Sequence, residues 1–294
     1  MNRRFLLSIL LLLPILASAD ISGTCGDGVT YTYVDETGTL TISKTGEGSG
    51  AMTDFEHMFD DDLDDYRPNI PWLGQRMQIR EVVIEDGITH IGDLAFICCG
   101  KMTSLTIPNS VTSIGEEAFE GCTSLTSVVI PNGVTSIGYA TFSGCEQLVS
   151  VEIPEGVASI GDWAFSRCTS LTSVTIPSSV TSLGEGVFWD INFESVISMI
   201  EEPFAIKGES EEFSPFYHDT FQNAILYVPV GTVDMYKETK GWKEFVTIKE
   251  VGGTGIGHVE AQASDAPYYN LNGMRIVRPK KGIYIKNGKK LVIK

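Results

Sequence analysis

MTSLTIPNSVTSIGEEAFEGCTS, the stretch from Met102 to Ser124, decides the fold, because nearly the same string returns every 23 residues. Two columns keep this interval without slipping by a residue: Phe96, Phe119, Phe142, Phe165 and Phe188, and Gly92, Gly115, Gly138, Gly161 and Gly184. One such unit cannot bury its own apolar side. We therefore expect the units to stack, so that each apolar column becomes a continuous ladder in the interior.

The unit predicts a right-handed β-rich solenoid with parallel strands. A strand such as Leu125–Ile130 ends at Pro131, where a residue without an N–H is tolerated, and a second extended piece, Val134–Ile137, ends at Gly138. After the glycine we expect one short helical turn. Carboxylates follow the glycine in four of the units, and we expect them to favour the positive end of that turn rather than to be catalytic: Asp93, Glu116, Asp162 and Glu185.

The repeat resembles the BspA-like leucine-rich repeat family of Bacteroidetes type. Its unit reads roughly Leu-x-x-Val-x-Ile-Pro-x-x-Val-x-x-Ile-Gly-x-x-Ala-Phe-x-Gly-Cys-x-x, and Leu125–Gln147 fits nearly every fixed position, with Thr141 in the usual alanine place. The resemblance implies a leucine-rich-repeat horseshoe with short helical turns. It also implies an exported or surface-displayed bacterial protein of the kind often discussed as adhesins.

Residues 1–19 are predicted to be a secretory signal peptide. Arg3 and Arg4 precede an apolar run from Phe5 to Leu16, and a small-residue site ends at Ala19. A membrane anchor is the weaker alternative because a spanning helix needs about 20 apolar residues. Lipid attachment at Cys25 is also weaker, since the residues before it are a poor match. We expect a secreted or outer-surface protein.

The rest of the chain divides into five predicted segments. Residues 20–78 form an N-terminal β-hairpin cap, 79–192 five repeats, and 193–250 a degenerate repeat and C-terminal cap with a helix between Val233 and Phe245. Residues 251–267 form a glycine-rich linker. Two Asn-Gly pairs in residues 268–294 predict a basic β-hairpin tail, which resembles the C-terminal modules of proteins exported by the type IX route.

Charge differs between body and tail. Residues 20–254 carry 36 acidic and 11 basic side chains, whereas residues 255–294 carry 2 and 8. Nucleic-acid binding requires a basic stripe that displaces counterions, so the acidic body argues against it. We expect a monomer with a protein ligand, such as a host surface or matrix protein, while a glycan is the alternative.

No motif predicts catalysis, a metal or a cofactor. The acidic run at 59–66 lacks the glycine and glutamate of an EF-hand loop, which favours a solvated loop. The histidines have no sequence neighbours that suggest a nucleophile or a metal: His57, His90, His218 and His258. One cysteine per repeat predicts an interior column of free thiols rather than disulfides: Cys99, Cys122, Cys145 and Cys168. Cys25 and Cys98 stay unassigned.

Two faces are candidates for binding. The exposed strand positions of the middle repeats are Ser127, Val129, Ser150 and Glu152, and the side of the turns offers Tyr139, Trp163 and Trp189. Aromatic side chains are frequent anchors of protein interfaces and also stack on sugars, although edge packing between repeats is an equally good interpretation of these three. We therefore predict a non-catalytic, adhesin-like protein-binding module. A glycan-binding accessory protein is the alternative, and an exported hydrolase ranks third.

Overall fold

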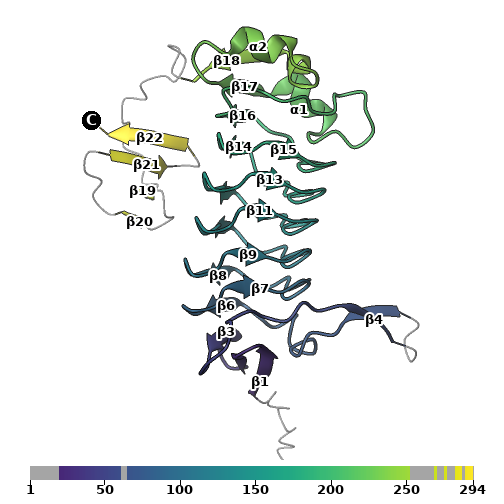
Figure 1. Ribbon diagram of the computed structural model, residues 1–294, viewed down its shortest axis with the longest axis vertical. Coiled ribbons are helices and arrows are strands. Elements are labelled where there is room, and N and C mark those ends of the chain that lie inside the picture. Colours follow the sequence, from purple (N-terminus) through teal and green to yellow (C-terminus); the bar gives the residue numbers. More distant parts are fainter. Residues whose placement is uncertain are drawn as a thin grey trace, which may run out of the picture.

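The computed structural model describes residues 20–60 and 65–251, together with the backbone of four short strands between residues 268 and 293. Its repeats stack as rungs in one column (Figure 1). The predicted solenoid with parallel strands is therefore confirmed. The signal peptide, the linker and residues 61–64 of the acidic run lie outside the described residues.

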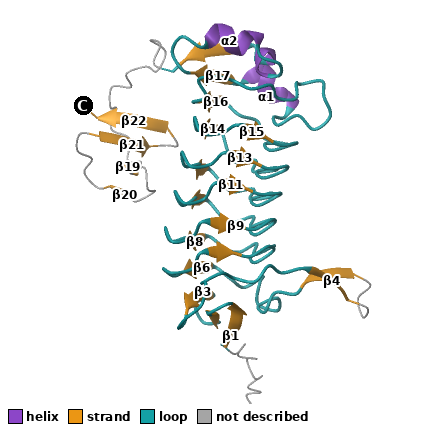
Figure 2. Cartoon of the chain, viewed as in Figure 1, coloured by secondary structure: helices purple, strands orange, loops and turns teal. Residues whose placement is uncertain are grey.

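Each regular rung contributes two short strands joined by loops (Figure 2). The first strands run parallel to one another up the column: β3 (Thr39–Lys44), β6 (Glu81–Ile84), β8 (Ser104–Thr106), β10 (Ser127–Val129), β12 (Ser150–Glu152), β14 (Ser173–Ile176), β16 (Ser195–Ser198), β17 (Ile225–Val228) and β18 (Thr247–Glu250). The second strands are β7 (His90–Ile91), β9 (Ser113–Ile114), β11 (Ser136–Ile137), β13 (Ser159–Ile160) and β15 (Ser182–Leu183). Residues one repeat apart pair directly, as Ser127 does with Ser150, so each sequence column is a column in space.

The interior is organised around a ladder of aromatic rings. Phe96, Phe119, Phe142, Phe165 and Phe188 are all buried, and consecutive rings stack with centroids 5.3 to 5.7 Å apart. Trp72 extends the stack at the N-terminal end and Phe216 at the C-terminal end. The cysteine column lies beside the rings, and each thiol from Cys122 onward donates to a phenylalanine carbonyl of the preceding rung, as Cys145 Sγ does to Phe119 O at 3.4 Å. All six cysteines are free, and Cys98 alone is exposed.

Consecutive turns stand in place of the helical turn that we expected after each glycine. Two residues of each turn segment have positive φ, for example Glu117 at 55° and Gly121 at 69°. These angles orient alternate N–H groups toward the next rung. Phe119 N, for example, donates to Thr141 O at 2.9 Å. Bonds between rungs thus replace the bonds that a helix would make within itself.

The carboxylates after the glycines also have another role than the one expected. Asp93 Oδ1 accepts the N–H of Glu116 at 2.7 Å, and Asp162 Oδ1 accepts the N–H of Glu185 at 2.7 Å. They bridge neighbouring rungs instead of facing a helix end. For these two aspartates the structural interpretation holds, but its mechanism is a side chain to backbone hydrogen bond to the next rung.

The N-terminal cap covers the first rung. β1 (Ile21–Gly26), β2 (Val29–Val34) and β3 pair antiparallel, and β3 then pairs parallel with β6. A second hairpin, β4 (His57–Asp60) and β5 (Asp65–Pro68), projects sideways from the column (Figure 1). The cap donates two hydrogen bonds to the first turn segment. Phe55 N–H donates to Asp93 O at 3.2 Å, and the Trp72 indole Nε1–H donates to Ala95 O at 2.9 Å.

The C-terminal cap is built from residues 201–250. It contains α1 (His218–Asn223), α2 (Val233–Glu238) and the 3-10 helix η1 (Trp242–Glu244). The helix expected from Val233 to Phe245 is interrupted, because Gly241 has a φ of 81° that a helix does not allow. The cap supplies hydrogen-bond acceptors to the last regular turn segment. Gly186 N–H donates to the Phe213 carbonyl, and Phe188 N–H donates to the Pro215 carbonyl.

The tail strands form a sheet of their own in the order β20-β19-β21-β22. Their bounds are β19 (Tyr268–Tyr269), β20 (Arg275–Ile276), β21 (Gly282–Lys286) and β22 (Lys289–Ile293), and β21 and β22 pair antiparallel. No helix within the described residues is long and apolar enough to cross a membrane.

Candidate functional site

The strand face carries four of the candidate binding residues but no anchor. Ser127 and Val129 of β10 pair with Ser150 and Glu152 of β12. Val129 is 45% exposed, and partial burial raises the pKa of the Glu152 carboxyl. The four side chains lie together as expected, yet small and singly charged groups on a regular surface lack the aromatic or arginine side chains that dominate interface energies.

The turn side carries an aromatic patch near the C-terminal end of the regular repeats. We define this aromatic patch as Trp163, Trp189, Phe213 and Tyr217. Trp163 and Trp189 contact each other edge to face with ring centroids 6.1 Å apart, and both contact Phe213, at 5.1 and 6.1 Å. Tyr217 packs on Trp189 at 5.4 Å. All four rings are half-buried, so each is held in place while part of its surface remains exposed.

The backbone explains why Trp163 lies there. Trp163 itself has a φ of 60°, and Gly186 occupies the same column one rung later. A Cβ on Gly186 would stand 2.5 Å from the Trp163 ring. The missing side chain of Gly186 therefore leaves the space into which the indole folds. Both interpretations left open for the two tryptophans apply, because each ring packs between rungs and keeps part of its surface exposed.

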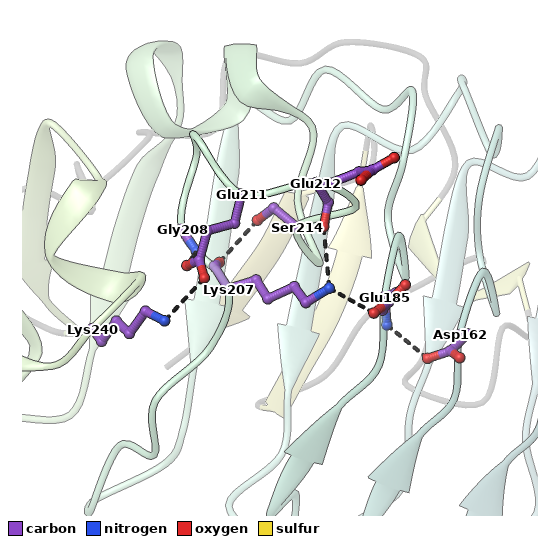
Figure 3. Close-up of polar contacts among 8 residues, drawn as sticks. All are labelled: Asp162, Glu185, Lys207, Gly208, Glu211, Glu212, Ser214 and Lys240. Carbon is purple, nitrogen blue, oxygen red and sulfur yellow. Dashed lines mark hydrogen bonds and ion pairs between the residues drawn. The ribbon is translucent and has the colours of Figure 1, made fainter.

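Phe213 and Tyr217 come from an insertion that breaks the 23-residue period. A polar frame fixes this segment (Figure 3). Lys207 Nζ donates to Glu185 Oε1 at 2.5 Å and to Glu212 O at 3.2 Å, and Ser214 Oγ donates to Lys207 O at 2.9 Å. Lys207 thus ties the inserted segment to the last regular rung.

A second ion pair holds the base of the insertion. Glu211 accepts the N–H of Gly208 at 2.7 Å and pairs with Lys240 at 3.0 Å. The Gly208 N–H first, and then Lys240, lower the pKa of the Glu211 carboxyl. The inserted segment is therefore attached to the last regular rung through Lys207 and to residue Lys240 through Glu211 (Figure 3). These attachments support the segment that carries Phe213 and Tyr217.

Tyr139 lies outside the aromatic patch. It shares a sequence column with Asp162 and Glu185 and is 44% exposed. Its pKa is raised by partial burial and by nearby carboxylates, with Glu117 first. The structure therefore brings Trp163 and Trp189 together and leaves Tyr139 alone in acidic surroundings.

Sequence reasoning missed Phe213 and Tyr217. The signal that could have found them is the loss of the period in residues 201–221, because insertions in repeat proteins map to loops on one face. The structure also gives three histidines side-chain partners that the sequence did not predict. His57 Nε2 lies 3.4 Å from Glu117, His218 Nε2 lies 2.8 Å from Asp219, and His90 contacts two partners. Within the described residues, no group of three or more potential ligands could hold a metal ion.

A stacked β-solenoid with a dissimilar cap at each end is the architecture of a repeat protein. Residues 76–202 match the family described as BspA type Leucine rich repeat region, in six copies. The chain therefore carries BspA-type leucine-rich repeats, and the resemblance stated from the sequence is confirmed. A comparison with curated proteins gave no match.

The chain is similar to solved structures that include leucine-rich repeat proteins and a pneumococcal antigen. A Treponema pallidum leucine-rich repeat protein is 23% identical, with a TM-score of 0.43, over 68% of this chain and 78% of that one. A leucine-rich cell surface protein of Faecalibacterium prausnitzii is 21% identical, with a TM-score of 0.39, over 79% and 73%. The pneumococcal vaccine antigen PcpA is 13% identical, with a TM-score of 0.33, over 80% and 99%.

Proposed function

We propose that this chain is an exported, adhesin-like module that binds a protein ligand through the aromatic patch on its turn side. Solenoid repeat proteins act as interaction modules through extended surfaces. The observation that carries the proposal is the insertion 201–217, which departs from the repeat and sets Phe213 and Tyr217 against the tryptophans of two regular rungs. Supported aromatic rings of this kind are the usual energetic centres of protein interfaces.

Export rests on the predicted signal peptide and on the family. A location outside the cell would present the patch to surface or matrix proteins of a host. The role requires no catalytic group, cofactor or metal. The strand face supplies the comparison surface, because it is regular and without aromatic anchors.

Binding should be tested with the mature chain, residues 20–294, on an array of purified host surface and matrix proteins. We expect Trp189→Ala to weaken the binding of any ligand found at least tenfold, because truncating an interface anchor costs about 2 kcal/mol or more. Val129→Ala is the matched control on the strand face and should leave affinity within about twofold. Loss of binding in Val129→Ala with normal binding in Trp189→Ala would place the ligand on the strand face and contradict the proposal.

A glycan is the second candidate ligand, because indole rings that keep exposed surface stack on sugar rings. The same variants applied to a glycan array separate the two classes. A glycan that binds the wild type and is lost in Trp163→Ala and Trp189→Ala, with no protein ligand found, would replace the first proposal. Circular dichroism of each variant should confirm that the rungs remain folded.

A further inference from the structure

A serine, a histidine and an aspartate meet at the junction of the N-terminal cap and the first rung. His90 of β7 pairs with Ser113 of β9 in parallel register, and His90 Nδ1 lies 2.8 Å from Ser113 Oγ. On the other side of the ring, His90 Nε2 lies 2.8 Å from Asp54 Oδ1. Asp54 belongs to a cap segment that runs beside β7, since Ala51 forms a parallel bridge with His90.

The hydrogen bonds fix which atom carries each proton. Partial burial acts to raise the pKa of the Asp54 carboxyl, but hydrogen bonds from His90 and from the Asp93 N–H outweigh it and hold that pKa below its usual value. An ionised carboxylate only accepts hydrogen bonds, so Nε2 of the imidazole must be the donor to Asp54. In the neutral ring Nδ1 then has no proton, and Ser113 Oγ–H must donate to it.

This arrangement is that of a nucleophile, a general base and a group that orients the base. The two ring nitrogens are exchanged relative to the serine protease triad, in which Nε2 contacts the serine, but the roles follow from the contacts. Ser113 is exposed and His90 half-buried, so an acyl group can reach the hydroxyl from solvent while the base is held in place by the cap.

We propose that Ser113 is a nucleophile that accepts acyl groups from carboxylic esters, with His90 as its general base and Asp54 as a positioning residue. Ser113 Oγ attacks the ester carbonyl carbon while its proton passes to His90 Nδ1. The bond from that carbon to the leaving oxygen breaks, and the alcohol departs with the proton. Water then attacks the acyl-serine, His90 takes its proton and returns it to Ser113 Oγ, and the carboxylic acid is released.

The chain contains a matched internal control for this chemistry. Ser136 and Ser159 occupy the same column of the second strands as Ser113 and pair with each other between β11 and β13. One rung before Ser113 this column holds His90, whereas one rung before Ser136 it holds Ser113, which is not a base. Ser136 therefore shares the backbone setting and solvent access of Ser113 but lacks a base.

The test uses the mature chain with a fluorophosphonate probe and with p-nitrophenyl acetate, and mass spectrometry maps the modified residue. We expect probe labelling at Ser113 and not at Ser136, and ester hydrolysis that falls to the buffer rate in Ser113→Ala but is unchanged in Ser136→Ala. His90→Gln should slow labelling of Ser113 by about 100-fold, the lower range for loss of a general base.

Asp54→Asn separates positioning from a structural role. It should slow labelling at Ser113 at least tenfold while the melting temperature stays within a few degrees, because the asparagine still fits beside the imidazole. Labelling of Ser113 no faster than that of Ser136, or labelling unaffected by His90→Gln, would overturn the proposal and leave the three residues as a tie between cap and repeat. Neither outcome bears on the aromatic patch, which lies several rungs away.

Discussion

Replacing Phe142 by alanine tests whether the ring ladder holds the column together. Phe142 is buried and stacks on Phe119 and Phe165 with centroids 5.3 and 5.5 Å away and interplanar angles of 1° and 8°. Truncating a buried phenylalanine costs about 3–5 kcal/mol of unfolding free energy. Phe142→Leu retains most of the apolar volume and loses two ring contacts of about 0.5–1.5 kcal/mol each, so its cost should be about 1–3 kcal/mol.

Urea unfolding of the mature chain under reducing conditions, followed by circular dichroism, measures both variants. Because each rung contacts only its neighbours, a defect at Phe142 should also reduce the coupling between the two halves, and the transition of Phe142→Ala should broaden or split. Ser143→Ala, at the adjacent half-exposed position, should change stability by less than about 0.5 kcal/mol. A cost below about 1 kcal/mol for Phe142→Ala, or one equal to that of Phe142→Leu, would refute the reasoning.

Three further predictions concern single residues. Burial first, and then Glu117, raise the pKa of Glu120 from 4.5 to about 7. Between these two pH values the folded state keeps a proton that the unfolded state loses, so the stability of the wild type falls as pH rises. The gain in melting temperature of Glu120→Gln over wild type should therefore grow from pH 4 to pH 8, and a constant difference would contradict the shift. In the native protein Ellman's reagent should modify Cys98, the exposed thiol. After denaturation without reductant it should modify all six thiols, and a count of four or fewer would indicate a disulfide. Gly144 has a φ of 70°, and a Cβ added there would stand 3.6 Å from its nearest neighbours. Gly144→Ala should therefore cost only the backbone strain, about 1 kcal/mol of unfolding free energy. Gly92→Ala should cost clearly more, because its Cβ would overlap the Thr53 carbonyl oxygen.

The 23-residue period was enough to predict the solenoid, its parallel strands and its buried phenylalanine and cysteine columns. The helical turn was expected because Glu-Glu-Ala-Phe after a glycine resembles the start of a helix. The structure instead has two left-handed residues in each turn segment, such as Glu117 and Gly121. Hydrogen bonds to the next rung stabilise this backbone, and those bonds cannot be seen in the sequence of a single repeat.

The candidate site was predicted only in part. Trp163 and Trp189 belong to the periodic region, so their approach follows from the stacking of rungs. Phe213 and Tyr217 belong to an insertion without a period, and its path depends on the ion pair of Lys207 with Glu185 and that of Lys240 with Glu211. The contact between His90 and Ser113 was within reach of sequence reasoning, because they share a column 23 residues apart. Asp54 lies in the non-repeating cap, and its position needed the structure.

The bonds between turn segments give the column a direction. In each turn segment alternate N–H groups donate to the next rung. The first turn segment therefore presents carbonyls that need donors from the cap, and Phe55 N–H and the Trp72 indole N–H supply them. The last rung presents N–H groups that need acceptors, and Pro215 supplies a carbonyl while having no N–H that would require a further partner. The two caps are therefore chemically opposite and not interchangeable. Any whole rung inserted or deleted between them leaves both ends matched, so the length of the column can change without redesign of its ends.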